Sequence, residues 1–122
     1  MLPRRRKSLY SGPSLKEVGV KMSKLLSELK EEEREALENL AKALAYFARG
    51  RAYGYIDRLA NAFSVVTARQ VVTEALRDLR SLRDRGEDAY LPKLKDVEAV
   101  LRLSESDLSV LKVVAALALS YG

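Results

Sequence analysis

A chain of 122 residues is long enough for one domain with a modest core and too short for two. Its 48% apolar and 32% charged residues are typical of a soluble globular protein, not of a disordered or membrane-embedded one. The chain contains neither Cys nor His, which excludes a disulfide scaffold, the usual zinc sites, thiol nucleophiles and His-based triads. The formal net charge of +5 favours an anionic partner.

The N-terminus is strongly basic, and we expect residues 1–13 to be a flexible arm ahead of a helical domain of residues 14–122. Its four consecutive cations are Arg4, Arg5, Arg6 and Lys7. Such a run can bind phosphates by releasing counterions, which makes these residues candidate nucleic-acid contacts. A solubilising tail is the alternative interpretation.

No apolar run of a secretory signal follows the arm, and the most apolar stretch, residues 108–121, is too short to span a bilayer. We therefore expect a cytoplasmic protein without membrane contact.

Helical spacing of apolar residues begins after Ser14, which forms a capping box with Glu17. The apolar stripe stops in the charged run after Lys30, and two helices meeting near that residue are predicted. The second should bury one apolar face, made of Leu37, Leu40, Ala41, Leu44 and Phe47.

Gly50 and Gly54 precede a short predicted helix that extends to Phe63. Thr67 with Gln70 forms a capping box for a longer helix that ends at Gly86, the expected glycine just beyond its C-terminus. Its apolar face contains Val71, Val72, Ala75, Leu76, Leu79 and Leu82.

The C-terminal third predicts a loop over residues 86–95 and a helix from Asp96 to Leu103. Ser104 with Asp107 then predicts the start of a last helix. No segment alternates with the period of a strand, so the fold class is all-α, a single compact bundle of five to six helices.

Arginine and tyrosine residues cluster around Gly50 and Gly54: Arg49, Arg51, Tyr53, Tyr55 and Arg58, with Tyr46 nearby. Such interleaving can pair phosphates and stack bases of single-stranded nucleic acid. Alternatively, Tyr46 and Tyr55 are core rings and the arginines are solvated.

A second basic stripe, with Arg69, Arg77 and Arg80, is interrupted by Glu74 and Asp78 on the same helix. Pairing within that helix would make the stripe an ordinary solvated face.

The last helix is apolar on nearly all sides, so it is either central in the bundle or half of an interface. For an interface we expect self-association through Val110, Val113 and Leu119.

Catalysis and bound cofactors are not expected. The acidic run of residues 28–38 lacks the spacing of a calcium loop or a carboxylate–His metal motif, and no Gly-rich phosphate loop is present. We expect neither metal nor cofactor.

The segment of residues 53–62, YGYIDRLANA, resembles the small subunit of the archaeal type I-A CRISPR interference complex (Cascade). The order and size of the later helices extend the resemblance over roughly residues 43–122. It implies a non-catalytic helical subunit that contacts the backbone and large subunits and copies of itself, and helps to hold the displaced single-stranded DNA. The alternative is a helical adaptor without a nucleic-acid role, docking through its acidic surface and last helix.

Overall fold

The computed structural model describes residues 26–48 and 54–122. Besides the helical residues 26–28, these ranges contain five α-helices and one 3-10 helix, and no strand: α3 (Glu31–Leu44), η1 (Ala45–Ala48), α4 (Tyr55–Ala60), α5 (Val65–Asp84), α6 (Leu94–Ser106) and α7 (Ser109–Tyr121). The all-α prediction is confirmed.

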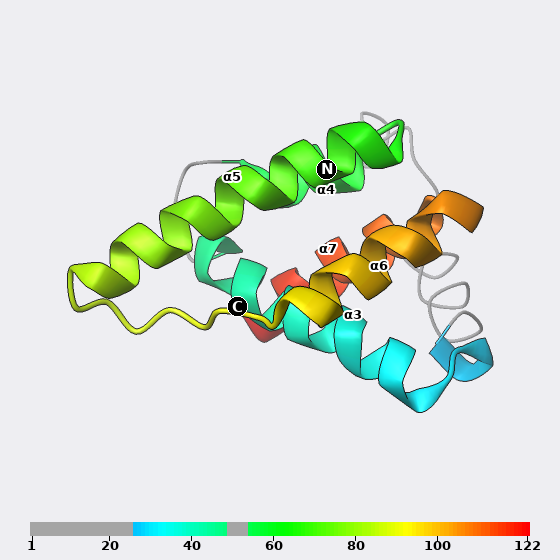
Figure 1. Ribbon diagram of the computed structural model, residues 1–122, viewed down its shortest axis with the longest axis horizontal. Helices are drawn as coiled ribbons and strands as arrows, with labels where there is room; N and C mark the ends of the chain where they lie inside the picture. The colour runs from blue at the N-terminus through cyan, green and yellow to red at the C-terminus, as the bar shows by residue number, and fades with distance from the viewer. Residues whose placement is uncertain (1–25, 49–53) are drawn as a thin grey trace, which may run out of the picture.

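The longest helix, α5, runs along the top of the view in Figure 1, and α6 returns in the opposite direction below it. Helix α3 packs against α6 and α7, while α4 packs against α5 and α7. The core between them contains completely buried side chains from five helices, among them Leu37, Leu40, Leu59, Leu79, Leu101 and Leu111. Of the helices in the described ranges, none has the length and apolarity needed to cross a membrane.

The predicted break near Lys30 is present. Residues 26–28 are helical, and α3 begins at Glu31. The carboxylate of Glu33 accepts a hydrogen bond from the backbone N–H of Lys30 at 2.9 Å, which satisfies a donor that the helix start leaves free. All five apolar residues expected on the inner face of this segment are buried.

Helix α4 ends earlier than predicted, at Ala60. The side chain of Lys112 donates a hydrogen bond to the carbonyl of Ala60 at 2.7 Å, and Asn61 donates to the carbonyl of Asp57 at 2.9 Å. These bonds satisfy carbonyls at the helix end. Phe63 therefore lies beyond the helix, where its side chain is 81% exposed instead of buried.

Helix α5 starts at Val65, so the capping box predicted at Thr67 is wrong. Ser64 is the N-cap, and its hydroxyl accepts the backbone N–H of Thr67 at 3.1 Å. The predicted C-terminal glycine is confirmed. Gly86 has φ of 92°, and the amides of Gly86 and Glu87 donate to the carbonyls of Arg83 and Leu82, both at 2.9 Å, in a Schellman motif.

Helix α6 is longer than predicted, and Ser104 lies inside it instead of capping α7. The buried Ser104 hydroxyl donates to the carbonyl of Val100 at 2.8 Å, one turn earlier. Asp107 takes the capping role, because its carboxylate accepts from both the backbone N–H and the hydroxyl of Ser109, at 3.0 and 2.6 Å.

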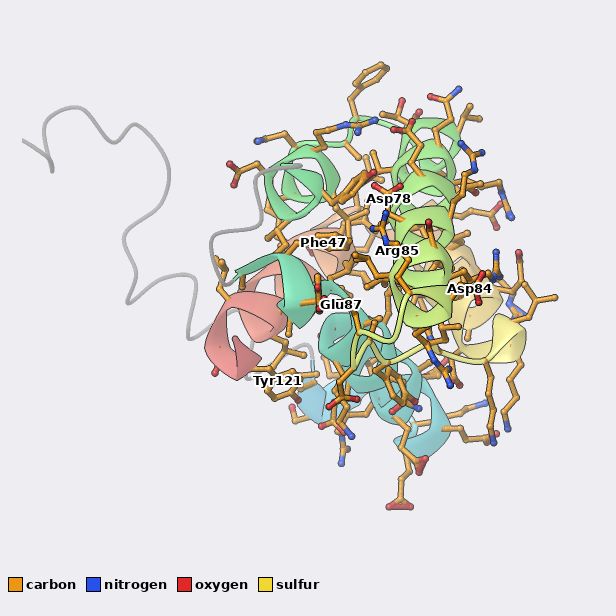
Figure 2. The ribbon with its side chains drawn as sticks, turned by 90° about the vertical axis from the view of Figure 1, so that its left-hand side faces the viewer. Phe47, Asp78, Asp84, Arg85, Glu87 and Tyr121 are labelled. Carbon is orange, nitrogen blue, oxygen red and sulfur yellow. The ribbon has the colours of Figure 1, made fainter. Side chains whose placement is uncertain are left out.

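The loop between α5 and α6 closes one end of the molecule, which faces the viewer in Figure 2. Ala89 in this loop is 6% exposed and joins the core. The labelled side chains of Glu87 and Tyr121 lie on the same side of α5, away from Asp84.

Candidate nucleic-acid interface

The structure describes only part of the predicted Arg/Tyr cluster. Arg58 and the neighbouring Tyr46 and Tyr55 lie within the described residues. The remaining candidate contacts lie outside them and stay predictions: Arg49, Arg51, Tyr53, Arg4, Arg5, Arg6 and Lys7.

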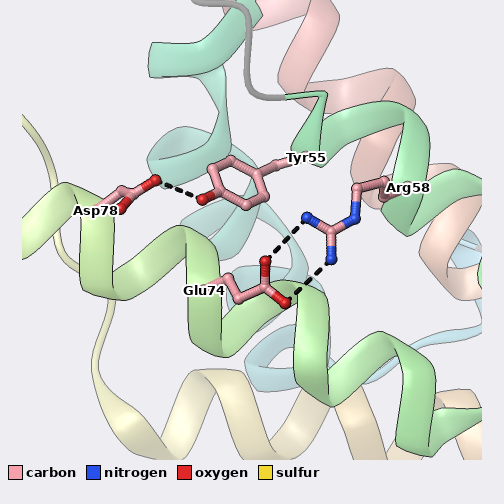
Figure 3. Close-up of polar contacts among 4 residues, drawn as sticks. All are labelled: Tyr55, Arg58, Glu74 and Asp78. Atoms are coloured by element: carbon pink, nitrogen blue, oxygen red, sulfur yellow. Dashed lines mark hydrogen bonds and ion pairs between the residues drawn. The ribbon is translucent and has the colours of Figure 1, made fainter.

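Tyr55 is a core ring and not a surface for base stacking. It is 6% exposed, and its ring packs edge-to-face on Phe47 with 4.8 Å between the ring centroids. Its hydroxyl donates a hydrogen bond to the carboxylate of Asp78 (Figure 3). Burial, together with this bond and the charge of Asp78, raises the pKa of Tyr55 to about 12. The alternative interpretation, in which this tyrosine is a core ring and not a base-stacking surface, is therefore the correct one for Tyr55.

Arg58 lies at the surface in a two-point ion pair with Glu74 (Figure 3). The two guanidinium nitrogens donate to the two carboxylate oxygens at 3.0 and 3.1 Å, and the guanidinium carbon lies 5.6 Å from the centroid of the Tyr55 ring. The hydrogen bonds raise the pKa of Arg58 and lower that of Glu74. The Arg58 side chain remains 45% exposed, so a phosphate can reach it but must compete with Glu74.

Glu74 and Asp78 of α5 bond to residues of α4, so the expected pairing within α5 is wrong. Arg69 instead reaches α6, where its guanidinium donates to the Glu98 carboxylate at 2.7 and 3.1 Å. This pair lowers the pKa of Glu98 and raises that of Arg69.

Arg77 and Arg80 are consequently left without a carboxylate partner. Both are exposed on the outer face of α5, one turn apart, and neither makes a hydrogen bond or ion pair with any residue in ranges 26–48 and 54–122. Arg77 is near enough to Glu74 to contribute to its lowered pKa. We call the three arginines Arg58, Arg77 and Arg80 the α5 basic face; Arg77 lies near the Arg58–Glu74 pair, and Arg80 lies one turn further on, beside Arg69 and Glu98 and one turn before the exposed Asp84. Exposed guanidinium groups can contact phosphates without reading the base sequence.

The three residues expected at a self-association contact differ in exposure: two are buried and one is exposed. Val110 and Val113 are 2% and 6% exposed, so neither presents a surface to a second copy. Leu119 is 60% exposed. Because α7 packs against α3, η1, α4 and α6, most of its apolar residues belong to the core, while Lys112 and Leu119 remain exposed.

Buried polar groups do not point to a ligand. Asp96 is 7% exposed and accepts a hydrogen bond from the side-chain amide of Asn39 at 3.0 Å. Each buried side-chain nitrogen and oxygen that the structure describes has a partner. The same residues contain no cluster of three or more acidic side chains that could hold a metal ion.

Sequence reasoning missed a hollow of about 890 Å³ beside the α5–α6 loop. Its lining includes Tyr46, Arg83, Glu87, Tyr90 and Tyr121. These residues come from η1, the end of α5, the loop and the end of α7. Only the glycine signal at the end of α5 marks this region in the sequence, because the tyrosines lie far apart along the chain.

Comparison with known proteins gives one family. Residues 43–89 match the model of the CRISPR-associated protein family Cas_Csa5, the type I-A small subunit. The matched segment runs from the end of α3 through η1, α4 and α5 into the following loop. It confirms the resemblance seen at residues 53–62. No curated protein and no solved structure matches the chain.

Proposed function

From this match to a CRISPR-associated family, we propose that the chain is a non-catalytic small subunit of an RNA-guided antiviral complex of type I-A. In that complex it binds the phosphate backbone of the displaced single-stranded DNA and contacts the backbone and large subunits. The observation that carries the proposal is the match itself, because it spans α4 and α5 and so includes the whole α5 basic face.

The electrostatics of α5 support a phosphate-binding role. Arg77 and Arg80 have no ion pair to break before they bind a phosphate. Arg58 must first give up its ion pair with Glu74. Each phosphate that a cation neutralises releases counterions from the strand. Binding by such a surface weakens steeply with salt and depends little on base sequence.

The direct test is fluorescence anisotropy of a labelled single-stranded oligonucleotide over a series of salt concentrations. The double variant Arg77→Ala/Arg80→Ala should bind several-fold more weakly at low salt. The slope of log affinity against log salt should become shallower by about 1 to 2, for two lost phosphate contacts. The control Arg77→Lys/Arg80→Lys keeps both charges and should keep most of the affinity.

A second pair of variants tests the competition for Arg58. Glu74→Gln removes the carboxylate that holds Arg58, and we expect several-fold tighter binding and a steeper salt slope. Glu98→Gln makes the same charge change at the Arg69 pair and is the matched control. An equal gain in both variants would mean that only net charge matters, and a salt-insensitive affinity would contradict backbone binding altogether.

The adaptor alternative docks through the acidic surface of residues 28–38 and through the last helix. The burial of Val110 and Val113 removes most of the apolar face of that helix and leaves the acidic surface as its docking site.

A further inference from the structure

The hollow beside the α5–α6 loop is lined by an unusual share of the aromatic residues. Of the four tyrosines in the described ranges, three line it: Tyr46, Tyr90 and Tyr121. Tyr90 and Tyr121 are 44% and 40% exposed, in contrast to the buried Tyr55. Exposed aromatic rings that surround one concavity offer stacking surfaces for a planar group.

Charged groups of both signs complete the lining. Lys42 and Arg83 are exposed and make no ion pair with any other described residue. Glu87 is fixed from one side, because its Oε1 atom accepts a hydrogen bond from the hydroxyl of Tyr46 at 2.8 Å. Its second carboxylate oxygen accepts no hydrogen bond within the described part of the chain. The hollow thus presents two cations, the oriented acceptor Glu87 and a second carboxylate, Asp88.

The wall that carries Glu87 and Tyr90 is held in place. The Schellman motif ties the backbone of Glu87 to the last turn of α5, and the amide of Ala89 donates to the carbonyl of Glu87 at 3.1 Å. The side chain of Ala89 anchors the same segment in the core. A preformed site loses less conformational entropy when it binds a ligand.

We propose that this hollow binds one nucleotide, with its base against the rings of Tyr90 and Tyr121, its phosphate near Lys42 and Arg83, and Glu87 facing the base edge. A carboxylate only accepts hydrogen bonds, so it favours a base whose edge carries an exocyclic amino group. The site therefore prefers cytosine to thymine or uracil. It would add base readout to the sequence-independent α5 basic face. The nucleotide belongs either to the strand of the proposed function or to a free mononucleotide.

The first experiment compares oligocytidylate with oligothymidylate, each of about 20 nucleotides, by anisotropy on the full chain. We expect the parent protein to bind oligocytidylate more tightly. Glu87→Gln should abolish this difference and leave the salt slope unchanged, since an amide can both accept and donate. Tyr90→Leu should weaken oligocytidylate binding about tenfold, as the loss of one stacked base predicts. Phe63→Leu replaces an exposed aromatic ring outside the hollow and is the matched control.

The second experiment separates the two sources of the nucleotide. The chain has no Trp, so its intrinsic fluorescence comes from tyrosine, and a base stacked on the hollow should quench it. Quenching by cytidine monophosphate that exceeds quenching by uridine monophosphate, and that is weaker in Tyr90→Leu, identifies a mononucleotide site. A preference shown only by the oligonucleotides assigns the hollow to a strand.

Failure of this inference is distinct from failure of the proposed function. Equal, salt-dependent binding of both oligonucleotides by the parent and by Tyr90→Leu would overturn the nucleotide site and leave the α5 basic face intact. Loss of a protein partner in Tyr90→Leu, without any effect on nucleotides, would also overturn it. Selective quenching by cytidine monophosphate without oligonucleotide binding would support the site and contradict the proposed function.

Discussion

Arg58 pairs with Glu74 in the structure and is proposed to pair with a phosphate when nucleic acid binds. The Arg58–Glu74 pair and the bond from Tyr55 to Asp78 join α4 to α5 at two points. The sequence could reveal that arginine and tyrosine gather here. It could not reveal that two carboxylates of the next helix face them, because that depends on the angle at which α4 turns into α5. The same angle leaves Arg77 and Arg80 unpaired.

Tyr55 gives a prediction at alkaline pH. Its folded-state pKa of about 12 lies above the ordinary value of 10.0, so its neutral form stabilises the fold. That contribution is complete below about pH 10 and is lost as the pH rises towards about 12. Tyr55→Phe should cost about 1 kcal/mol in the free energy of unfolding near pH 8. The difference between the two proteins should shrink between pH 10 and 12 in urea titrations.

Absorbance spectroscopy supplies the control for this assignment. Because burial also raises the pKa of Tyr121, the comparison is made in a Tyr121→Phe background. There the protein should show a late-ionising tyrosine that is absent after Tyr55→Phe and still present after Tyr90→Phe. A late phase that survives in Tyr55→Phe would mean that another ring is responsible, and would contradict the prediction.

The two ends of helix α5 differ in how well the sequence predicts them. Its C-terminal end was predictable, because a positive φ strongly favours glycine and Gly86 follows the last apolar turn. Its N-terminal end was ambiguous, since both Ser64 and Thr67 are good N-caps. Ser64 can act as the N-cap because α4 ends early, at Ala60, whose carbonyl accepts a hydrogen bond from Lys112, 52 residues further along the chain.

Gly86→Ala tests the boundary that the sequence identified. A Cβ atom at this position would meet nothing within 4 Å, so the cost comes from the backbone conformation alone. We expect the free energy of unfolding to fall by about 1 to 2 kcal/mol, as measured by urea or thermal denaturation. Gly86→Asn should cost less, because asparagine tolerates the left-handed region better. Equal losses would argue that crowding, not φ, makes glycine necessary.

In the molecule as a whole, α7 contributes its buried side to the core, against α3, η1, α4 and α6. Its sequence left two possibilities open, because a helix that is apolar on most sides suits either a core or an interface. The choice depends on how α3, α4 and α6 are arranged around it, which periodicity along one segment does not encode. The loop hollow was unpredictable for the same reason, since its walls meet only in the folded chain.

Two charged substitutions on α7 should have opposite outcomes. Val110→Glu places a carboxylate in the core without a partner and should destabilise the protein by more than about 3 kcal/mol. Leu119→Glu changes an exposed side chain and should leave the helical circular dichroism and the melting temperature nearly unchanged. Sedimentation of the parent and of Leu119→Glu tests whether this residue mediates self-association. A folded Val110→Glu protein would contradict the placement of this side of α7 in the core.

The hydrogen bond from Lys112 to Ala60 also bears on how the chain is made. It joins residues that are 52 positions apart, and α3, η1, α4, α5 and α6 are all translated before α7, against which α3, η1, α4 and α6 pack. While the ribosome is still adding α7, α6 can already cover one side of α3, but the side of α3 that packs against α7 is exposed. The nascent chain therefore carries an exposed apolar face that chaperones can bind until α7 emerges.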